Sequence, residues 1–276
     1  MNLDRVVVTT FPGYFFSTAL CLQSINTHVP DIPIDIVIDD FDLDQWPSYV
    51  DDCRQYLSNQ FPNLLIEFYK FSQIQNVNRA RAGGWFRQQL IKLHLDQIVS
   101  GNNWLLIDAD VVLLDSPDLT TVPVLPQTPG PIDHGNRCYV QHLLDTASPW
   151  LGEEREFLCA SGIPIRYISR DLLLKLRQHV ESVRGQNFLE LHLDSIANED
   201  IVAFDPSGIK PVMSEFQLIE VYRNQYHTCP LPLRCGANNF SHTSIKDWNL
   251  SRDHFASVPV PDHLWNKVLD FSSSYI

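Results

Sequence analysis

The stretch Trp104-Leu-Leu-Ile-Asp108-Ala109-Asp110-Val-Val-Leu-Leu114 places two carboxylates, one residue apart, between two apolar runs. The apolar residues before Asp108 predict a buried strand over residues 104–107. Ligands of open α/β sheets bind beyond the carboxyl ends of the strands, which is where Asp108 and Asp110 stand. Carboxylate oxygens suit Mg²⁺ or Mn²⁺, which keep positions open for phosphate oxygens. The stretch therefore predicts a divalent-metal site, and the alternative is a solvated turn between two strands.

The chain before this stretch alternates between strand-like and helix-like segments. Short runs rich in β-branched residues predict strands over residues 5–10, 34–38 and 64–69. Apolar residues at helical spacing predict helices over residues 14–26, 50–59 and 85–99. Such alternation predicts a Rossmann-like α/β fold, in which a mainly parallel sheet carries helices on both faces.

The chain after Asp115 changes character. Prolines at positions 117, 123, 126, 129 and 131 predict an extended or looping section without regular structure. We expect a boundary between two functional halves there, within one globular unit. Further helices are predicted over residues 171–183 and 215–226. Asp171 is expected as N-cap or first-turn acid of the first of these helices, and Gly185 follows its end.

Composition and charge narrow the range of functions. Hydrophobic residues at 44% and charged residues at 19% indicate a chain that fills a core and folds almost throughout. The formal net charge of −13 repels phosphate backbones and anionic membranes, so nucleic acid is not an expected partner. A small phosphorylated substrate stays compatible with this charge, because a bound divalent cation reverses the local potential.

The sequence also bears on location. It shows neither a secretory leader pattern nor an apolar stretch that would span a bilayer, so we expect a cytoplasmic protein without integral membrane contact. The six cysteines are scattered and lack zinc-site spacing, which favours reduced, mostly buried thiols.

A second motif precedes the aspartates: Gly83-Gly84-Trp85-Phe86-Arg87-Gln88-Gln89-Leu90-Ile91-Lys92-Leu93-His94. This segment, followed by D-x-D, resembles a bacterial and phage family of GT-A glycosyltransferases with a GW-x-x-QQ-x-x-KL helix. Lys92-Leu-His and Asp108-Ala-Asp are also similar to glycogenin-type retaining transferases. The resemblance implies a GT-A-like fold with a smaller acceptor subregion. It implies a single domain over residues 1–276, with a donor half at about 1–120, an acceptor half at 121–245 and a C-terminal segment at 246–276.

The resemblance also implies a site for a nucleotide-sugar donor. In the resembled enzymes the lysine lies close to the donor's diphosphate, and the end of the first strand holds the nucleobase. A Gly-Gly helix start favours phosphate on physical grounds, because unpaired N–H groups and the helix dipole attract anions. The alternative is an amphipathic helix whose Gln and Lys face water. The predicted donor-binding residues are Thr9, Thr10, Asp39, with Asp40 as its alternative, Arg79, Arg81, Gln88, Lys92, Asp108 and Lys246.

Near the end of the chain, the segment from Asn239 to Trp248 resembles the H-x-x-G-x-x-K-P-W element of glycogenin-type enzymes. Their histidine is the third metal ligand and their lysine contacts the diphosphate. The resemblance therefore implies that His242 joins Asp108 and Asp110 on Mn²⁺ or Mg²⁺, with Lys246 at the diphosphate. This copy has a shorter spacing, no glycine, and Asp247 in place of proline, so His227 is kept as an alternative ligand.

The segment Met213-Ser214-Glu215-Phe216-Gln217-Leu218 resembles an S-E-Y/F-E-L element of the first family. If the reaction inverts the anomeric centre, a carboxylate must accept the proton of the acceptor hydroxyl, and Glu215 is the first candidate for that base. Glu199 and Asp200 are the second. A helix-capping carboxylate is the alternative role for Glu215. If configuration is retained, these acids would orient the acceptor.

The predicted function is a metal-dependent glycosyltransferase that uses a nucleotide-sugar donor, with UDP-sugars favoured, and an acceptor expected to be a carbohydrate. Two alternatives remain. The aspartate stretch also satisfies the hhhhDxDxV pattern of haloacid dehalogenase-like phosphatases, in which Asp108 would be a nucleophile. Those enzymes place the motif on the first strand and need acids downstream, whereas here three predicted strands precede it. The other alternative is a non-catalytic carbohydrate-binding relative.

Overall fold

The computed structural model describes residues 3–11, 14–40, 48–74, 84–113, 116, 122–124, 150–152, 165–198, 215–226, 233–235 and 242–244. Its strands are β1 (Arg5–Thr10), β2 (Ile34–Ile38), β3 (Ile66–Lys70), β4 (Asn103–Asp108), β5 (Val111–Leu113), β6 (Val122–Val124), β7 (Ile165–Ser169), β8 (Leu233–Cys235) and β9 (His242–Ser244). Its helices are α1 (Phe15–His28), α2 (Tyr49–Gln60), α3 (Gly84–Leu93), α5 (Arg170–Arg184), α6 (Phe188–Asn198) and α7 (Glu215–Tyr226), with short 3-10 turns η3 (Phe71–Gln73) and η5 (Leu95–Gln97).

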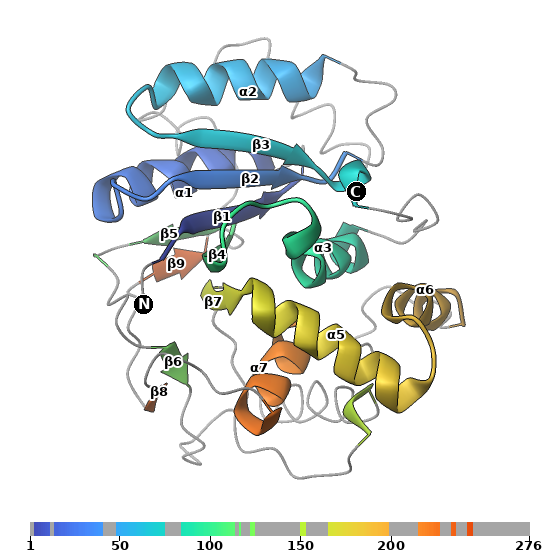
Figure 1. Ribbon diagram of the computed structural model, residues 1–276. Helices are drawn as coiled ribbons and strands as arrows, with labels where there is room; N and C mark the ends of the chain where they lie inside the picture. The colour runs from blue at the N-terminus through green and yellow to red at the C-terminus, as the bar shows by residue number, and fades with distance from the viewer. Residues whose placement is uncertain are drawn as a thin grey trace, which may run out of the picture.

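The main sheet has the strand order β3-β2-β1-β4-β7 (Figure 1). Strands β3, β2, β1 and β4 run parallel to one another, and β7 pairs antiparallel with β4. The predicted α/β class with a mainly parallel sheet is therefore confirmed. Strand β4 lies between β1 and β7, so the run before Asp108 is an interior strand, as its apolar sequence requires.

Helices cover both faces of this sheet because successive strand residues point to opposite sides. Val6 and Val8 of β1 belong to a buried cluster that includes Leu22 of α1 and Leu57 of α2. Val7 belongs to a second buried cluster, whose members include residues of β4 and of helices α3, α5, α6 and α7. In Figure 1, α1 and α2 accordingly lie on one side and α3, α5 and α7 on the other. The expected two-faced covering is confirmed.

Two small sheets add contacts between distant parts of the chain. Strand β5, directly after the aspartates, pairs antiparallel with β9 near the end of the sequence. Strand β6 pairs parallel with β8. The proline-rich section is thus not wholly irregular, and that prediction is corrected at residues 122–124. Pro123 is tolerated there because, among the strands that the structure describes, β6 has a neighbour on one side only.

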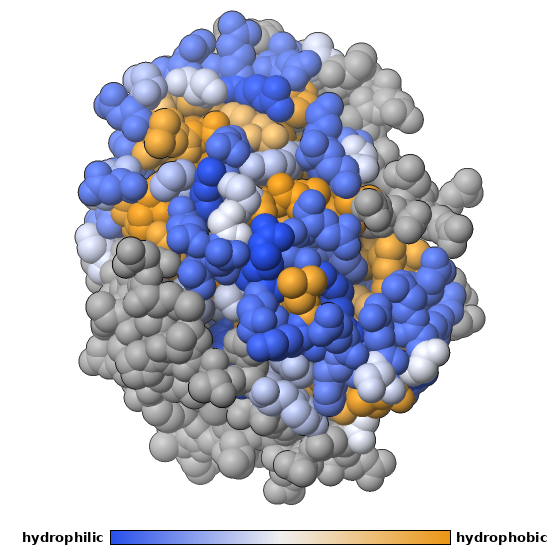
Figure 2. Space-filling view, viewed as in Figure 1, coloured by the Kyte–Doolittle hydropathy of each residue, from blue (hydrophilic) through white to orange (hydrophobic). Residues whose placement is uncertain are grey.

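The described residues on the face seen in Figure 2 are mostly hydrophilic, with apolar residues in smaller separate patches. None of the helices in the described part of the chain is long and apolar enough to span a bilayer. Cys21 and Cys53 are buried and form no disulfide with a described cysteine, in line with the reduced, buried thiols predicted from the sequence.

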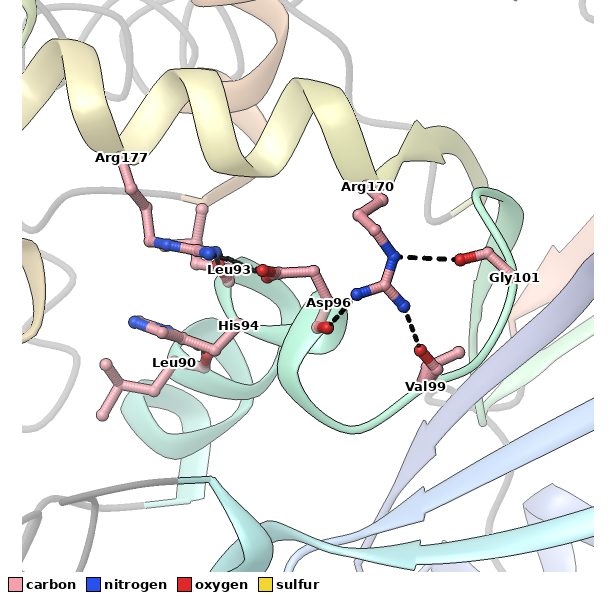
Figure 3. A network of polar contacts seen from close by, with 8 residues as sticks. All are labelled: Leu90, Leu93, His94, Asp96, Val99, Gly101, Arg170 and Arg177. Carbon is pink, nitrogen blue, oxygen red and sulfur yellow. Dashed lines mark hydrogen bonds and ion pairs between the residues drawn. The ribbon is translucent and has the colours of Figure 1, made fainter.

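The helix predicted over residues 85–99 ends at Leu93, so that prediction is wrong beyond this residue. The next residues form turn η5 because two arginines of α5 bind their backbone (Figure 3). Arg177 donates to Leu93 O and to the Asp96 carboxylate. Arg170 donates to the carbonyls of Asp96, Val99 and Gly101. Carbonyls held by arginines no longer need helical N–H partners, so tertiary contacts override the helical pattern here.

Helix α5 begins one residue before its predicted start and ends one residue after its predicted end. Ser169 is the N-cap, since its Oγ accepts from Leu172 N at 3.1 Å, and Asp171 is the first-turn acid. Gly185 ends the helix with φ of +67°, a conformation that glycine adopts without steric cost. Helix α6 was not predicted, although Asn187 accepts from the N–H groups of Leu189 and Glu190 as a cap would.

Candidate active site

Polar side chains gather where the parallel strands end. In the register of β1 and β4, Thr9 is the partner of Asp108, and Asp39 follows the last residue of β2. Because β1, β2 and β4 run in the same direction, these residues share one edge of the sheet. Thr9 and Asp108 alternate with Val8 and Ile107 of the other cluster, so both lie on the face covered by α3 and α7.

Lys92 of α3 joins this edge directly. Its Nζ lies 2.8 Å from Asp108 Oδ1. The Lys92 side chain is only 3% exposed, whereas that of Asp108 is 18% exposed. The aspartate therefore faces partly outward while the lysine lies beneath it.

Glu215, the first residue of α7, approaches the same lysine. Lys92 Nζ donates to Glu215 Oε1 at 2.9 Å, across 123 positions in sequence. The backbone N–H of Glu215 donates to Gln89 Oε1 at 3.1 Å, which satisfies one free donor of the helix start. Three sequence-distant segments, β4, α3 and α7, thus meet at one ammonium group.

The charge state of Lys92 follows from these neighbours. Burial alone lowers the pKa of Lys92, but the carboxylates of Asp108 and Glu215 outweigh it and hold the pKa above its ordinary value. The ammonium is therefore charged at neutral pH, and it partly compensates the two acids.

A second group of charged side chains is linked to Lys92 through the Phe216 ring. Lys92 Nζ lies 4.1 Å from the centroid of this ring, and the guanidinium carbon of Arg166 lies 4.6 Å from it. Arg166 Nε lies 3.5 Å from Glu220 Oε1, to which Arg223 donates at 3.0 Å. Burial lowers the pKa of Arg166 to about 10, although Glu220 opposes this effect. Arg166 nevertheless stays charged at neutral pH.

Asp39 and Asp40, the two alternatives at the end of β2, have different partners. Arg87 Nε donates to Asp39 Oδ2 at 2.7 Å, and both side chains are buried. Asp40 lies at a more exposed position, where it accepts from Ser72 N at 2.9 Å and from Ser72 Oγ at 2.7 Å. The first carboxylate is therefore fixed by an arginine of α3, whereas the second caps turn η3.

Two hydrogen-bonding atoms of the site lack a partner among the described residues. These atoms, Thr9 Oγ1 and Gln89 Nε2, are buried. Thr10, in contrast, shares a 2.6 Å hydrogen bond with Thr18. Gln88 is half-buried on α3. An unpaired buried donor or acceptor costs about 1–3 kcal/mol, so Thr9 and Gln89 are suited to meet a ligand.

Asp110 lies in the turn between β4 and β5 and is 4% exposed. Burial raises the pKa of the Cys21 thiol, and the negative charges of Asp110 and Asp108 raise it further. The charges of both aspartates therefore reach Cys21 of α1. Their oxygens are the donor type that Mn²⁺ or Mg²⁺ binds. No group of three or more metal-binding side chains gathers within the described ranges, so a cation there would need ligands beyond these two carboxylates.

Strand β9 brings the C-terminal part of the chain next to the aspartates. Its register pairs Ser244 with Val111, directly after Asp110, and His242 with Leu113. His242 thus lies at the far end of this strand pair, and its side chain is not among those described. Five other predicted site residues lie outside the described ranges, namely Arg79, Arg81, Glu199, Asp200 and Lys246, as does the alternative ligand His227.

Sequence reasoning missed several members of this site: Arg87, Gln89, Arg166 and Phe216. Gln89 had a detectable signal, because it lies three positions before Lys92 and so shares a helix face with it. Arg166 and Phe216 had none, since only the tertiary fold brings β7 and α7 together.

The chain matches one family model and is similar to several solved structures. Residues 15–218 match a family described as "Family of unknown function (DUF6492)". No curated protein matches the chain. Among solved structures, the galactosyltransferase LgtC in complex with donor and acceptor sugar analogs is similar at 12% identity and a TM-score of 0.41, over 72% of this chain and 66% of that chain.

Two further solved structures are similar at the same level. An active-site mutant of LgtC has 13% identity and a TM-score of 0.46, over 96% of this chain and 99% of that chain. The apo form of the glycosyltransferase GlyE from Streptococcus pneumoniae TIGR4 has 12% identity and a TM-score of 0.39, over 84% of this chain and 45% of that chain.

Proposed function

The chain belongs to the DUF6492 family, a family of unknown function, and we propose from its own site that it is a glycosyltransferase. It would move a sugar from a nucleotide-diphosphate donor, with a UDP-sugar favoured, to a hydroxyl acceptor. The observation that carries the proposal is the buried Lys92 between Asp108, at the end of a parallel strand, and Glu215, at the start of a helix. This arrangement brings together Asp108, the acid proposed to face the sugar donor, and Glu215, the acid proposed to face the acceptor.

The sheet supports the donor half of the proposal. A ligand beyond the carboxyl ends of β1, β2 and β4 would meet Thr9, Asp39 and Asp108 at one edge. The Thr9 hydroxyl, which has no hydrogen-bond partner within the described part of the chain, is available to such a ligand. Arg79, Arg81, Gln88 and Lys246 complete the proposed donor-binding set with Thr10, and Lys92 supports this set by holding Asp108.

Asp108 and Asp110 would hold Mn²⁺ or Mg²⁺, with His242 as the proposed third protein ligand. When bound, the cation would neutralise the charge that develops on the leaving nucleotide. A chain of net charge −13 needs such a cation between its acids and a diphosphate.

Glu215 is the proposed base if the reaction inverts the anomeric centre, with Glu199 and Asp200 as further candidates. Its carboxylate is 4% exposed and already bound by Lys92, so it has a fixed position before an acceptor arrives. If configuration is retained, Glu215 would orient the acceptor hydroxyl.

Release of nucleotide tests the proposal. The purified full chain is incubated with UDP- and GDP-sugars, a panel of mono- and disaccharide acceptors, and Mn²⁺ or chelator, and free UDP or GDP is measured. We expect UDP release that requires both Mn²⁺ and an acceptor, and that is lost in Asp108→Asn. Inorganic phosphate from sugar phosphates would favour the phosphatase instead, and sugar binding without turnover would favour a non-catalytic relative.

A further inference from the structure

The ammonium group of Lys92 is fully occupied by described residues. It has three N–H donors. Two face carboxylate oxygens, Asp108 Oδ1 at 2.8 Å and Glu215 Oε1 at 2.9 Å. The third side of the ammonium has the Phe216 ring, with the centroid 4.1 Å away. At 3% exposure, the lysine has little room for a further partner such as a phosphate oxygen.

The two carboxylates on Lys92 belong to different parts of the site. Asp108 ends β4, on the side proposed for the donor, and Glu215 begins α7, on the side proposed for the acceptor. One cation thus serves two buried or half-buried anions. A change at either carboxylate alters how strongly Lys92 is held by the other, because the three charges share one interaction network.

We propose that Lys92 is a positioning residue that couples Asp108 to Glu215, and that it is not a ligand of substrate phosphate. The ammonium fixes the orientation of both carboxylates, so occupancy of one side of the site is felt on the other. The assignment of these sides to donor and acceptor rests on the proposed function, whereas the coupling itself does not.

Glu220 provides a matched control for Glu215. Glu220 lies on the same helix as Glu215 and is equally buried, at 3% exposure. Its partners are Arg223 and Arg166 instead of Lys92. A loss of charge at Glu220 therefore tests whether any buried acid of α7 communicates with Lys92, or only the one that touches it.

Thermal unfolding of a double-mutant cycle tests the coupling. Lys92→Met leaves two carboxylates without their shared cation, and we expect it to lower Tm by about 5 °C or more. Adding Glu215→Gln should restore about half of that loss, because one of the uncompensated charges is then removed. Adding Glu220→Gln should instead lower Tm further. Equal, additive effects of the two glutamate substitutions would overturn the proposal.

The cycle has a second form that keeps Lys92. If Lys92→Met does not fold, Asp108→Asn and Glu215→Gln are combined in the wild-type background. Because the two carboxylates share one ammonium, we expect their effects on Tm to be non-additive by about 2 °C or more. Additivity of these two substitutions would overturn the proposal as well.

Nucleotide affinity provides a readout that a purely structural lysine would not change. With UDP and Mn²⁺ as the probe, Glu215→Gln should change the UDP Kd by about threefold or more when Lys92 is present, and by less in the Lys92→Met background. The same change in both backgrounds would mean that Lys92 does not transmit it. Absence of UDP binding in the wild type would count against the proposed function, and the unfolding cycle would still decide the coupling.

Discussion

Arg177 of helix α5 holds Asp96 of turn η5 through two parallel contacts, 2.7 Å to Oδ1 and 2.6 Å to Oδ2 (Figure 3). Their side chains are 12% and 5% exposed, so this ion pair is largely shielded from water. The pair fixes the segment between α3, which carries Lys92, and β4, which carries Asp108. It therefore supports the site without belonging to it.

Replacement of Arg177 should destabilise the fold. We expect Arg177→Met to cost about 3 kcal/mol, because it leaves Asp96 without its partner in a shielded place. Urea unfolding measures the loss. The control is Lys175→Met on the same helix, whose ion pair with Asp171 is exposed at 55% and 59%. That change should cost less than about 0.5 kcal/mol. Equal losses in the two variants would show that the Arg177 pair contributes no more than a surface pair.

Variants of Asp39 and Arg87 distinguish a contribution to stability from a contribution to UDP binding. We expect Asp39→Asn and Arg87→Met each to cost about 2 kcal/mol, since each removes one partner of a buried charged hydrogen bond. Only Asp39→Asn should also weaken UDP binding, measured by titration calorimetry, because only it removes the carboxylate proposed to meet the nucleoside. Wild-type UDP affinity in Asp39→Asn would remove Asp39 from the donor-binding set.

Acid should destabilise the protein through two buried histidines. Burial lowers the pKa of His94 to about 4, with Arg177 contributing, and lowers the pKa of His192 to about 3, with His94 contributing. The unfolded chain binds protons near the ordinary histidine pKa of about 6.5, so stability is full above that pH and falls between about 6.5 and 3.

One group opposes this trend. Burial raises the pKa of Asp35 to about 6, so the folded state takes up that proton more readily and gains stability as the pH falls below 6. The histidines therefore have to be isolated by comparison. Urea unfolding from pH 7 to pH 4 should show a shallower loss for His192→Gln than for the wild type. An identical slope would mean that His192 does not stay neutral in the fold.

Much of the fold could be predicted from the sequence because turn residues separate the elements, and because apolar residues are spaced differently in strands and in helices. The bounds of β1, β2 and α7 match their predictions. The prediction failed where a tertiary contact decides the backbone, as at Leu93, whose carbonyl is bound by Arg177. No local pattern reports a partner that is 84 positions away.

The site divides in the same way. The resemblance of their two motifs predicts Asp108 and Lys92 in one site, and the structure has the two side chains in contact. The ion pair of Lys92 with Glu215 could not be predicted, since it depends on how α7 packs against α3. As a result of this packing, Lys92, which the resemblance places at the diphosphate, lies buried between Asp108 and Glu215.

The metal-dependent donor site is tested most directly by titration calorimetry of UDP into the wild type and Asp110→Asn, each with Mn²⁺ and with chelator. The control is Asp171→Asn, which removes one negative charge from an exposed position on α5. We predict that the wild type and Asp171→Asn bind UDP only with Mn²⁺, and that Asp110→Asn loses at least about tenfold in affinity, the worth of one charge-assisted contact. Unchanged Mn²⁺-dependent UDP affinity in Asp110→Asn would contradict a donor site at these aspartates.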